Sequence, residues 1–438
     1  MDPARRFIRG GAVLVEGSTI TSVLDAVELE RLGTFTGELM NVPGLTLIPG
    51  FVQTHIHLCQ TLFRGLADDM DLLDWLVLRI FPFEAAHNSS SMHASAMLGI
   101  AELIRSGTTT IMDMGSVHHE EQVVRAVEES GLRACVGTTL MDANPAYPRL
   151  SEPTGSALRS AQEQARAWHG GAGGRIRYAA TPRFVLSCTE ELLREAWAMT
   201  RDFDGMLFHT HAAENSREMQ AVRSRYGMDN VEYFASIGVL HANSCLAHCV
   251  WLNDRELALM RERDARVLHC PSSNLKLGSG VARVPEMLRR GISVSLGADG
   301  APCNNSLDMF REMRLAALIQ KSAHGPAVMR AQEVLELATT GGAAALGLTH
   351  AIGSIEPGKQ ADLVLLDLSG VGMPCVLESA EQIASAIVYS GSPANVDSVM
   401  IAGTWLFRKG EFVFLEEARL QETAREEIRA LLTRVEPT

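Results

Sequence analysis

The chain of 438 residues is longer than a single hydrophobic core usually supports, so we expect one large barrel or two domains. Apolar residues make up 46% and charged residues 21% of the sequence, which is typical of a globular protein and excludes a disordered chain. The net charge of −13 gives no electrostatic reason to bind nucleic acid or an anionic membrane, so we expect a small-molecule partner.

Targeting signals and cysteine patterns add further exclusions. The sequence has no uninterrupted apolar run of about 18 residues, and its first residues, Met1-Asp-Pro-Ala-Arg-Arg, lack the apolar segment of a signal peptide. The eight cysteines are scattered without a C-x-x-C pair, which argues against a zinc ribbon and a disulfide framework. We therefore predict a cytoplasmic protein with no membrane segment.

Both ends of the chain carry β-type patterns. Residues 9–25 predict a β-hairpin around Gly17 and Ser18, and a short strand follows at residues 45–48. Apolar β-type runs return at residues 361–367 and 399–407, followed by a surface helix over residues 415–435. We predict one small discontinuous β-sandwich domain built from residues 1–48 and 352–438.

Between the two ends, short apolar strands alternate with amphipathic helices, as in successive βα units. The candidate strands are residues 51–57, 108–114, 133–140, 176–184, 206–212, 244–250, 266–270 and 293–298. Eight such units predict an α/β fold, a (β/α)8 TIM-type barrel over residues 49–351. The alternative is a doubly wound open sheet, but no G-x-G-x-x-G follows the first strand.

Three helical stretches can be placed inside this region. Residues 71–86 and 90–105 have apolar residues at helical spacing, and Gly107 ends the second stretch. Residues 306–322 predict a helix with Ser306 as its N-cap. We assign Trp75, on the first of these helices, to core packing.

Metal-ligating residue types recur at the ends of the predicted strands. His55 and His57 lie one residue apart on a strand, so their side chains share a face and can hold one ion. An isolated H-x-H is more often a polar strand cap, but His211 and Asp299 follow later strands, and in a barrel these strand ends converge. Three imidazoles and a carboxylate suit zinc, with ferrous iron as the alternative. His209 shares the face of His211 and is a rival ligand.

Two further residues are placed for acid–base chemistry. Glu214 lies three residues after His211, where it can take a proton from an activated water and deliver it to a nitrogen leaving group. His248 stands at another predicted strand end and can polarise the water or contact the substrate. We predict that the catalytic residues are Glu214, His248 and Asp299. His269 is expected to be a polar residue with its hydrogen bonds satisfied.

The ordered motifs of the chain resemble the amidohydrolase superfamily, in its cytosine-deaminase-like branch. They are Pro49 to His57, His211 to Glu214, His248-Cys249, His269 to Leu277, Gly297 to Gly300 and Gly353 to Leu363. The resemblance implies a barrel joined to a β-sandwich, one divalent metal on His55, His57, His211 and Asp299, a proton shuttle at Glu214, and assistance from His248. It also implies a homo-oligomer, a dimer or tetramer. Relatives have a further strand before residues 2–6, so the sandwich is expected to lack one N-terminal strand.

The same resemblance bears on the number of metal ions. Two-metal barrels of this kind use a carbamylated lysine on the fourth strand, and this chain has no lysine before Lys276. We therefore predict a mononuclear site. The smaller zinc deaminase architecture is excluded because the chain has no P-C-x-x-C.

The substrate is harder to predict, because two resemblances compete. Residues 64–69, 275–280 and 304–310 are similar to S-adenosylhomocysteine and methylthioadenosine deaminases, whereas residues 57–60 and 181–184 are similar to guanine deaminase, where the matching glutamine and arginine hold the base. Because the planar fork of an arginine suits a ring carbonyl, we favour hydrolytic deamination of a ring with a guanine-like edge, such as guanine, isocytosine, a pterin or an aminotriazine. The predicted substrate contacts are Gln60, Arg183, Phe184, Cys303 and Asn304. The alternatives are deamination of 5'-modified adenosines, triazine dechlorination and an inactive scaffold.

Overall fold

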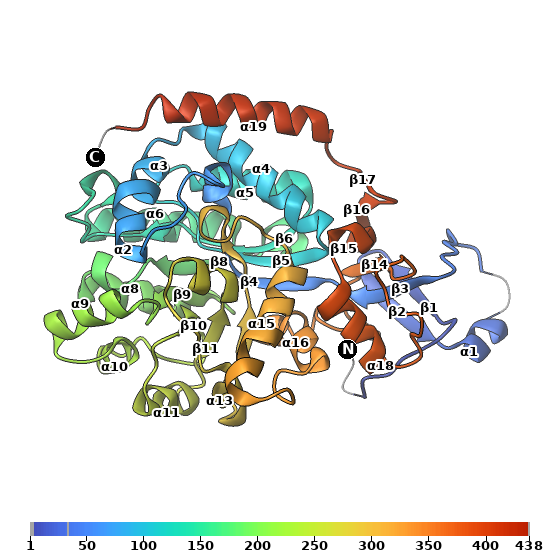
Figure 1. Cartoon of the computed structure of the whole chain (residues 1–438). Coiled ribbons are helices and arrows are strands. Elements are labelled where there is room, and N and C mark those ends of the chain that lie inside the picture. The colour runs from blue at the N-terminus through green and yellow to red at the C-terminus, as the bar shows by residue number, and fades with distance from the viewer. Residues whose placement is uncertain (1–3, 33–34, 437–438) are drawn as a thin grey trace.

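The computed structural model describes residues 4–32 and 35–436, and its centre is a curved parallel sheet (Figure 1). The strands run in the order β12-β11-β10-β9-β8-β6-β5-β4-β13, and all pair in parallel. Their bounds are β4 (Phe51–His57), β5 (Thr108–Asp113), β6 (Arg133–Val136), β8 (Ile176–Pro182), β9 (Leu207–Ala212), β10 (Ser244–His248), β11 (Arg266–His269), β12 (Val294–Leu296) and β13 (Asp299–Gly300). The predicted strands are confirmed, except that 133–140 is divided into β6 and β7 (Thr139–Leu140).

The sheet closes through the two short strands at its end. β13 follows β12 directly in the chain and pairs with β4, so that Asp299 lies opposite Ile56 and Gly300 opposite His57. At Gly297, between β12 and β13, a Cβ atom would come within 2.7 Å of the backbone nitrogen of His55. Glycine therefore allows the last strand to approach the first closely enough to bring Asp299 beside the histidines. The predicted (β/α)8 barrel is confirmed.

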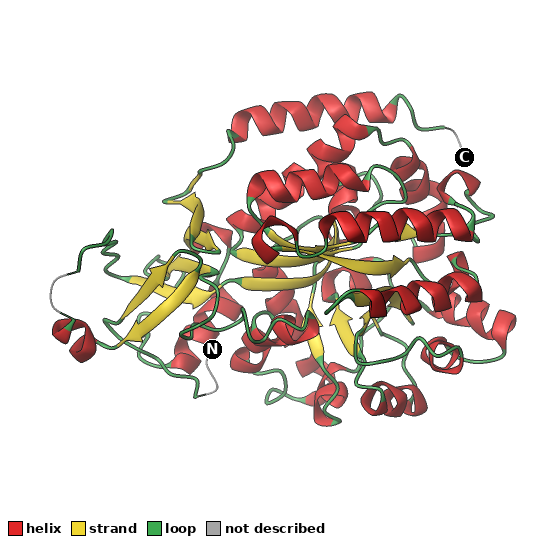
Figure 2. Ribbon diagram, turned by 180° about the vertical axis from the view of Figure 1, so that it is seen from behind, coloured by secondary structure: helices red, strands yellow, loops and turns green. Residues whose placement is uncertain are grey.

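Helices cover the outside of this sheet (Figure 2). The longer ones are α4 (Ser89–Arg105), α5 (Glu120–Ser130), α6 (Thr154–Trp168), α8 (Glu190–Met199), α9 (Ser216–Tyr226), α11 (Asp254–Glu262) and α15 (Met309–His324). The predicted helix over 71–86 is observed as α2 (Leu72–Trp75), a π-helical turn η2 (Leu76–Ile80) and α3 (Phe81–Ala85). The predicted N-cap Ser306 is wrong, because α15 begins later and the Asp308 side chain accepts the bond from Phe310 N.

The remaining helices are shorter and connect the barrel strands or flank the small sheet. They are α1 (Ala26–Arg31), α7 (Gly171–Gly174), α10 (Asn230–Ser236), α12 (Pro271–Lys276), α13 (Val284–Arg289), α14 (Ala301–Asn304), α16 (Ala331–Leu337), α17 (Thr340–Ala345) and α18 (Ala380–Ser385). Short 3-10 turns and a second π-helical turn lie among them: η1 (Leu58–Phe63), η3 (Pro148–Leu150), η4 (Val185–Ser187), η5 (Thr200–Asp202), η6 (Ala386–Ser390) and η7 (Pro393–Asn395).

The two chain ends meet in β-structure beside the barrel. The predicted hairpin is confirmed as β1 (Ala12–Glu16) and β2 (Thr19–Leu24). A second sheet runs in the order β17-β16-β15-β14-β3 and joins β3 (Leu45–Pro49) from the N-terminal end to β14 (Leu363–Asp367), β15 (Val396–Ile401), β16 (Thr404–Arg408) and β17 (Glu411–Phe412). Ile20 of the hairpin and Leu363 and Met400 of the second sheet share one apolar cluster.

The last helix, α19 (Glu417–Leu432), leaves the small sheet and lies over α4 of the barrel (Figure 1). Ala424 and Leu431 are buried against Phe63 and Phe83, and Glu417 pairs with Arg105 at the end of α4. The rest of the helix is largely exposed, as expected of a surface helix. The division into residues 1–48 with 352–438 and residues 49–351 stays a prediction.

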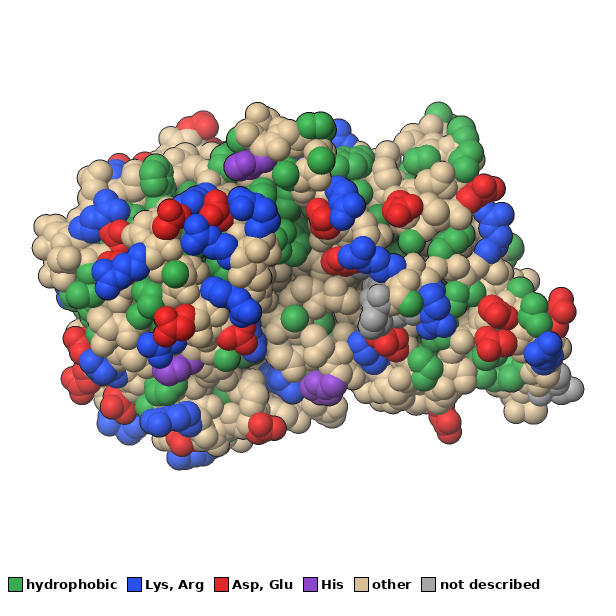
Figure 3. Space-filling view, turned by 90° about the horizontal axis from the view of Figure 1, so that it is seen from below, with side chains coloured by type: hydrophobic (Ala, Val, Ile, Leu, Met, Phe, Trp, Pro, Cys, Tyr) green, Lys and Arg blue, Asp and Glu red, His purple; other side chains and the backbone are tan. Residues whose placement is uncertain are grey.

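Acidic and basic side chains are interspersed on the face shown in Figure 3. None of the described helices is both long and apolar enough to cross a membrane.

Candidate metal centre and active site

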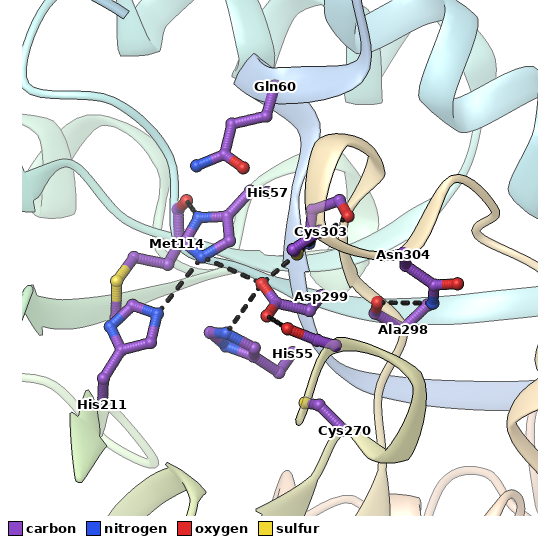
Figure 4. A network of polar contacts seen from close by, with 12 residues as sticks. His55, His57, Gln60, Met114, His211, Cys270, Ala298, Asp299, Cys303 and Asn304 are labelled. Atoms are coloured by element: carbon purple, nitrogen blue, oxygen red, sulfur yellow. Dashed lines mark hydrogen bonds and ion pairs between the residues drawn. The ribbon is translucent and has the colours of Figure 1, made fainter. Parts of the chain in front are cut away.

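Four imidazoles and one carboxylate meet at the carboxyl ends of the barrel strands. Figure 4 shows three of these imidazoles, those of His55, His57 and His211, around Asp299. His57 Nε2 lies 3.3 Å from His211 Nε2 and 3.4 Å from Asp299 Oδ1, and His55 Nε2 lies 3.4 Å from the same oxygen. His248 completes the group, with Nε2 3.8 Å from Asp299 Oδ2. The residues come from β4, β9, β10 and β13, so barrel closure is what brings them together.

Each imidazole is held through Nδ1, which leaves Nε2 facing the centre. His57 Nδ1 donates to Met114 O at 2.7 Å, His211 Nδ1 to Arg183 O at 2.7 Å, and His248 Nδ1 to Asn274 Oδ1 at 2.8 Å. A donor bond at Nδ1 selects the tautomer whose Nε2 carries a lone pair, which is the usual arrangement of metal-ligating histidines.

The donor set fits one divalent ion. His55 Nε2 is buried and has no hydrogen-bond partner among the described residues. Burial lowers the pKa of His57 to about 3 and that of His211 well below its usual value, so both rings are neutral, as ligands must be. The spacing of 3.3–3.4 Å between donors equals the edge of about 3.4 Å of a tetrahedron with ligands about 2.1 Å from zinc.

His209, the rival ligand, lies behind His55. Its Nε2 is 2.8 Å from His55 Nδ1, and its ring is completely buried. Among the described residues, the groups able to hold an ion include His211 but not His209. The structure therefore places His209 as the partner that orients His55.

Replacing His209 with leucine is expected to weaken zinc binding by about 10–100-fold without abolishing it, because His55 would lose the bond that fixes its ring. Competition with a chromophoric chelator measures the affinity. His209→Gln, which keeps a side chain able to bond to His55 Nδ1, is the matched control and should stay closer to the wild type. Equal affinity in all three proteins would contradict this role.

The backbone is strained at Asp299 and at Ala213, the residue before Glu214. Asp299 has a φ of 64°, and Ala213, just before Glu214, has a φ of 50°. Asp299 Oδ2 accepts a bond from Ser273 Oγ at 2.6 Å, which leaves Oδ1 facing the histidines. Left-handed backbone at non-glycine residues is costly and clusters at functional sites.

Glu214 is positioned to exchange protons. Its Oε2 lies 3.4 Å from His248 Nε2, and its Oε1 is buried without a hydrogen-bond partner in the described part of the chain. Its backbone N–H donates to Glu218 Oε2 at 2.8 Å, which holds the turn after β9. Burial, and then the charge of Asp299, raise the pKa of Glu214 well above its usual value.

A pocket opens at the candidate metal centre, and part of its lining is an apolar wall. The wall is made by Leu72, Trp75, Leu76, Phe184 and Leu277. Trp75 packs in a buried apolar cluster, as predicted, and it also lines this pocket from α2. The sequence analysis missed Leu72, Leu76 and Leu277, although 72, 75 and 76 have the spacing of one helix face.

Arg183 is already paired inside the pocket wall. Its two terminal nitrogens lie 2.6 and 3.1 Å from the carboxylate oxygens of Glu84, and its guanidinium lies 5.0 Å from the ring centroid of Phe81. Gln60 Nε2 donates to the same Glu84 carboxylate at 2.8 Å. The guanidinium fork expected to hold a guanine-like base is therefore occupied by Glu84, a residue that the sequence analysis missed. The signal in the sequence that could have indicated Glu84 is its position as an isolated acidic residue on the apolar helix α3.

Two other predicted substrate contacts are not among the residues lining the pocket. Asn304 Nδ2 donates to Ala298 O and Glu312 Oε1, both at 2.8 Å, and Cys303 Sγ donates to Gly300 O at 3.0 Å. Through these bonds both side chains stabilise the segment that follows β13. His269 was expected to be satisfied, but neither ring nitrogen has a hydrogen-bond partner among the described residues.

Breaking the Glu84–Arg183 pair is expected to destabilise the protein. Glu84→Leu would leave a buried guanidinium unpaired, at a cost of about 3–5 kcal/mol in the free energy of unfolding, measured by denaturant titration. The double variant Glu84→Leu/Arg183→Met removes both charges and should lose less than Glu84→Leu alone. A double variant less stable than the single one would contradict this account.

A parallel barrel whose strand ends gather imidazoles, an aspartate and a glutamate with one unpaired oxygen is the architecture of a metal-dependent hydrolase. The chain belongs to the amidohydrolase family, whose model matches residues 46–406.

Individual relatives within this family indicate the type of reaction, because those reported below are named as deaminases. The chain is 42% identical over 418 residues to a 5'-deoxyadenosine deaminase of Methanothermobacter thermautotrophicus, covering 95% of this chain and 94% of the relative. It is 36% identical over 431 residues to a 5-methylthioadenosine/S-adenosylhomocysteine deaminase of Pelotomaculum thermopropionicum, with 97% and 95% covered. The crystal structure of an adenosine deaminase from Xanthomonas campestris with bound zinc superposes with a TM-score of 0.90 at 30% identity, covering 97% of this chain and 94% of that one. The protein is thus a hydrolytic deaminase, as the sequence predicted.

Proposed function

We propose that the protein deaminates a 5'-modified adenosine, the alternative of the sequence analysis, rather than a free base with a guanine-like edge. The observation that carries this choice is the Glu84–Arg183 pair, because the guanidinium expected to read a ring carbonyl is buried and bonded at both terminal nitrogens. The names of the relatives above point the same way.

We further propose that His55, His57, His211 and Asp299 hold a single divalent ion, zinc by preference. When bound, the ion would supply Lewis-acid activation of water at neutral pH. The positions of the surrounding residues then decide which of them transfers protons and which orients the water.

Glu214 carries the protons in this scheme. Its free Oε1 faces the pocket, so it can accept the proton of the attacking water and deliver it to the ring nitrogen beside the amino-bearing carbon. His248 stands between Glu214 and Asp299 and keeps the attacking water oriented. The amino group leaves as ammonia, and the ring gains a carbonyl.

The charge of the pocket favours an uncharged 5' substituent. Its lining includes the carboxylates of Glu214, Glu218 and Asp299, and Arg183, the cation among the described lining residues, is neutralised by Glu84. The wall is otherwise apolar. We therefore place 5'-deoxyadenosine and methylthioadenosine ahead of S-adenosylhomocysteine, whose carboxylate would find no free cation on the described wall.

A guanine-like free base remains the second candidate, because of Gln60. The Gln60 side chain lines the pocket and is completely buried. Its Oε1 has no hydrogen-bond partner among the described residues. A ring N–H or exocyclic amino group could satisfy this acceptor.

Ammonia release separates the two candidates. Zinc-loaded protein is assayed with 5'-deoxyadenosine, methylthioadenosine and S-adenosylhomocysteine in one series, and with guanine and isocytosine in the other. We expect turnover of the first two adenosines at higher kcat/KM than S-adenosylhomocysteine, and none of the free bases. Turnover of guanine alone would overturn the proposal and restore a base-reading role for Arg183 and Gln60.

A further inference from the structure

The floor of the barrel, at the opposite end from the active site, carries polar side chains that the proposed reaction does not use. Met112, Cys135 and Ala179 belong to the apolar cluster inside the barrel. Side chains two residues apart on a strand share a face, so Thr110, Arg133 and Arg177 also point inward, one layer nearer the amino ends of β5, β6 and β8. Strand pairing sets Thr110 beside Arg133 and Arg177 beside Cys135.

These side chains line a small cavity together with Arg175, Gly174, Leu346 and Leu348. Its volume is about 10 Å³, about the room needed by one water-sized body. Gly174, one of the lining residues, is exposed, so this part of the lining lies at the surface.

The positive charge around this cavity is compensated only in part by carboxylates of the described chain. Arg133 forms a bidentate pair with Asp362, at 2.8 and 2.9 Å. Arg175 donates to Leu132 O at 2.9 Å, and Arg177 has neither a hydrogen bond nor an ion pair to any described residue. Burial, and then the charge of Arg133, lower the pKa of Arg175, as expected in positive surroundings. Two guanidinium groups therefore lack a carboxylate partner within the described chain.

A buried hydroxyl faces the same cavity. Thr110 is completely buried, and its Oγ1 has no hydrogen-bond partner among the described residues. A buried polar group without a partner is costly, so native structures usually satisfy such groups. The Thr110 hydroxyl and the guanidinium groups around this cavity are hydrogen-bond donors. An anion is the kind of ligand that accepts bonds from such a set.

We propose that this arginine pocket, formed by Thr110, Arg133, Arg175 and Arg177, binds one monatomic anion, chloride in ordinary salt. The size of the cavity selects a single atom over phosphate or a carboxylate. The anion would compensate Arg175 and Arg177, accept the bond of Thr110 Oγ1 and tie together the amino ends of β5, β6 and β8.

Salt-dependent unfolding of the zinc-loaded protein tests the proposal. At equal ionic strength, sodium chloride should raise the unfolding midpoint above that in sodium acetate by about 1–2 °C. Arg177→Gln and Thr110→Val should lose this difference between the two salts. Arg166→Gln, an exposed arginine near the end of α6, is the matched control and should keep it.

A bromide-soaked crystal of the wild type gives a second measurement that needs no variant to fold. An anomalous peak between Thr110 Oγ1 and Arg177 is expected. The absence of a peak, or equal midpoints in the two salts for the wild type, would overturn the proposal. Stabilisation by phosphate but not by chloride would overturn the assignment to a monatomic anion.

Discussion

Replacing Glu214 with glutamine is expected to lower kcat by about 10²–10⁴-fold while leaving the bound metal in place. The carboxylate lines the pocket with one unpaired oxygen and the other 3.4 Å from His248 Nε2, so it is the group placed to move protons between water and substrate. Glutamine has nearly the same shape but cannot exchange a proton. Ammonia release measures kcat, and elemental analysis measures the metal.

Glu191→Gln is the matched control, because this residue is exposed on α8 and its neutralisation changes the net charge in the same way. It should retain the wild-type rate and metal content. If Glu214→Gln turned over as fast as this control, Glu214 would not be the proton carrier. If it lost the metal as well, Glu214 would belong to the ligand set instead.

Removing a predicted ligand should have an effect of similar size by a different route. His55→Ala deletes the Nε2 atom that lies 3.4 Å from Asp299 Oδ1, and we expect metal affinity and turnover to fall together by more than about 100-fold. The wild type treated with a chelator should behave in the same way and regain its rate with one equivalent of zinc per chain. Titration of zinc against recovered activity gives both affinity and stoichiometry.

His324→Ala serves as the control for histidine loss, because His324 is exposed at the end of α15. It should bind one equivalent and keep its rate. Recovery that requires two equivalents of zinc per wild-type chain would contradict the mononuclear site. Full metal content in His55→Ala would remove His55 from the ligand set.

The strand-end histidines could be identified from the sequence because barrel strands alternate with helices and place their carboxyl ends at one mouth. This reasoning predicted that residues at positions 55, 57, 211, 248 and 299 would meet. In the structure each of them has a polar side-chain atom 3.3–3.8 Å from one in another member of the set. It could not predict how each ring is held, since Met114, Arg183 and Asn274 contact the histidines from other segments of the chain.

At Arg183 the structure favours the alternative substrate class over the preferred one, for a physical reason. Near a strand end, an arginine can face a ligand or an acidic residue from a distant helix, and both possibilities suit the same local sequence. Glu84 lies 99 positions earlier on α3, and the fold brings its carboxylate against the Arg183 guanidinium. Thr110 and Arg177 are ordinary strand residues in the sequence, and only closure of the barrel places them around one cavity.

The sequence by itself determined the class of fold, through strand periodicity, and hydrolytic deamination, through the resemblance of its ordered motifs to the amidohydrolase superfamily. It also indicated the candidate metal-ligating residues, because they recur at the predicted strand ends. The tertiary structure decided which polar side chains are free. His209 turns to His55, Arg183 to Glu84 and Asn304 to Glu312. The atoms of the described pocket residues left without a hydrogen-bond partner then include Glu214 Oε1, Gln60 Oε1 and His248 Nε2. Pairing of buried polar groups is a matter of distance between remote segments, and no local pattern encodes it.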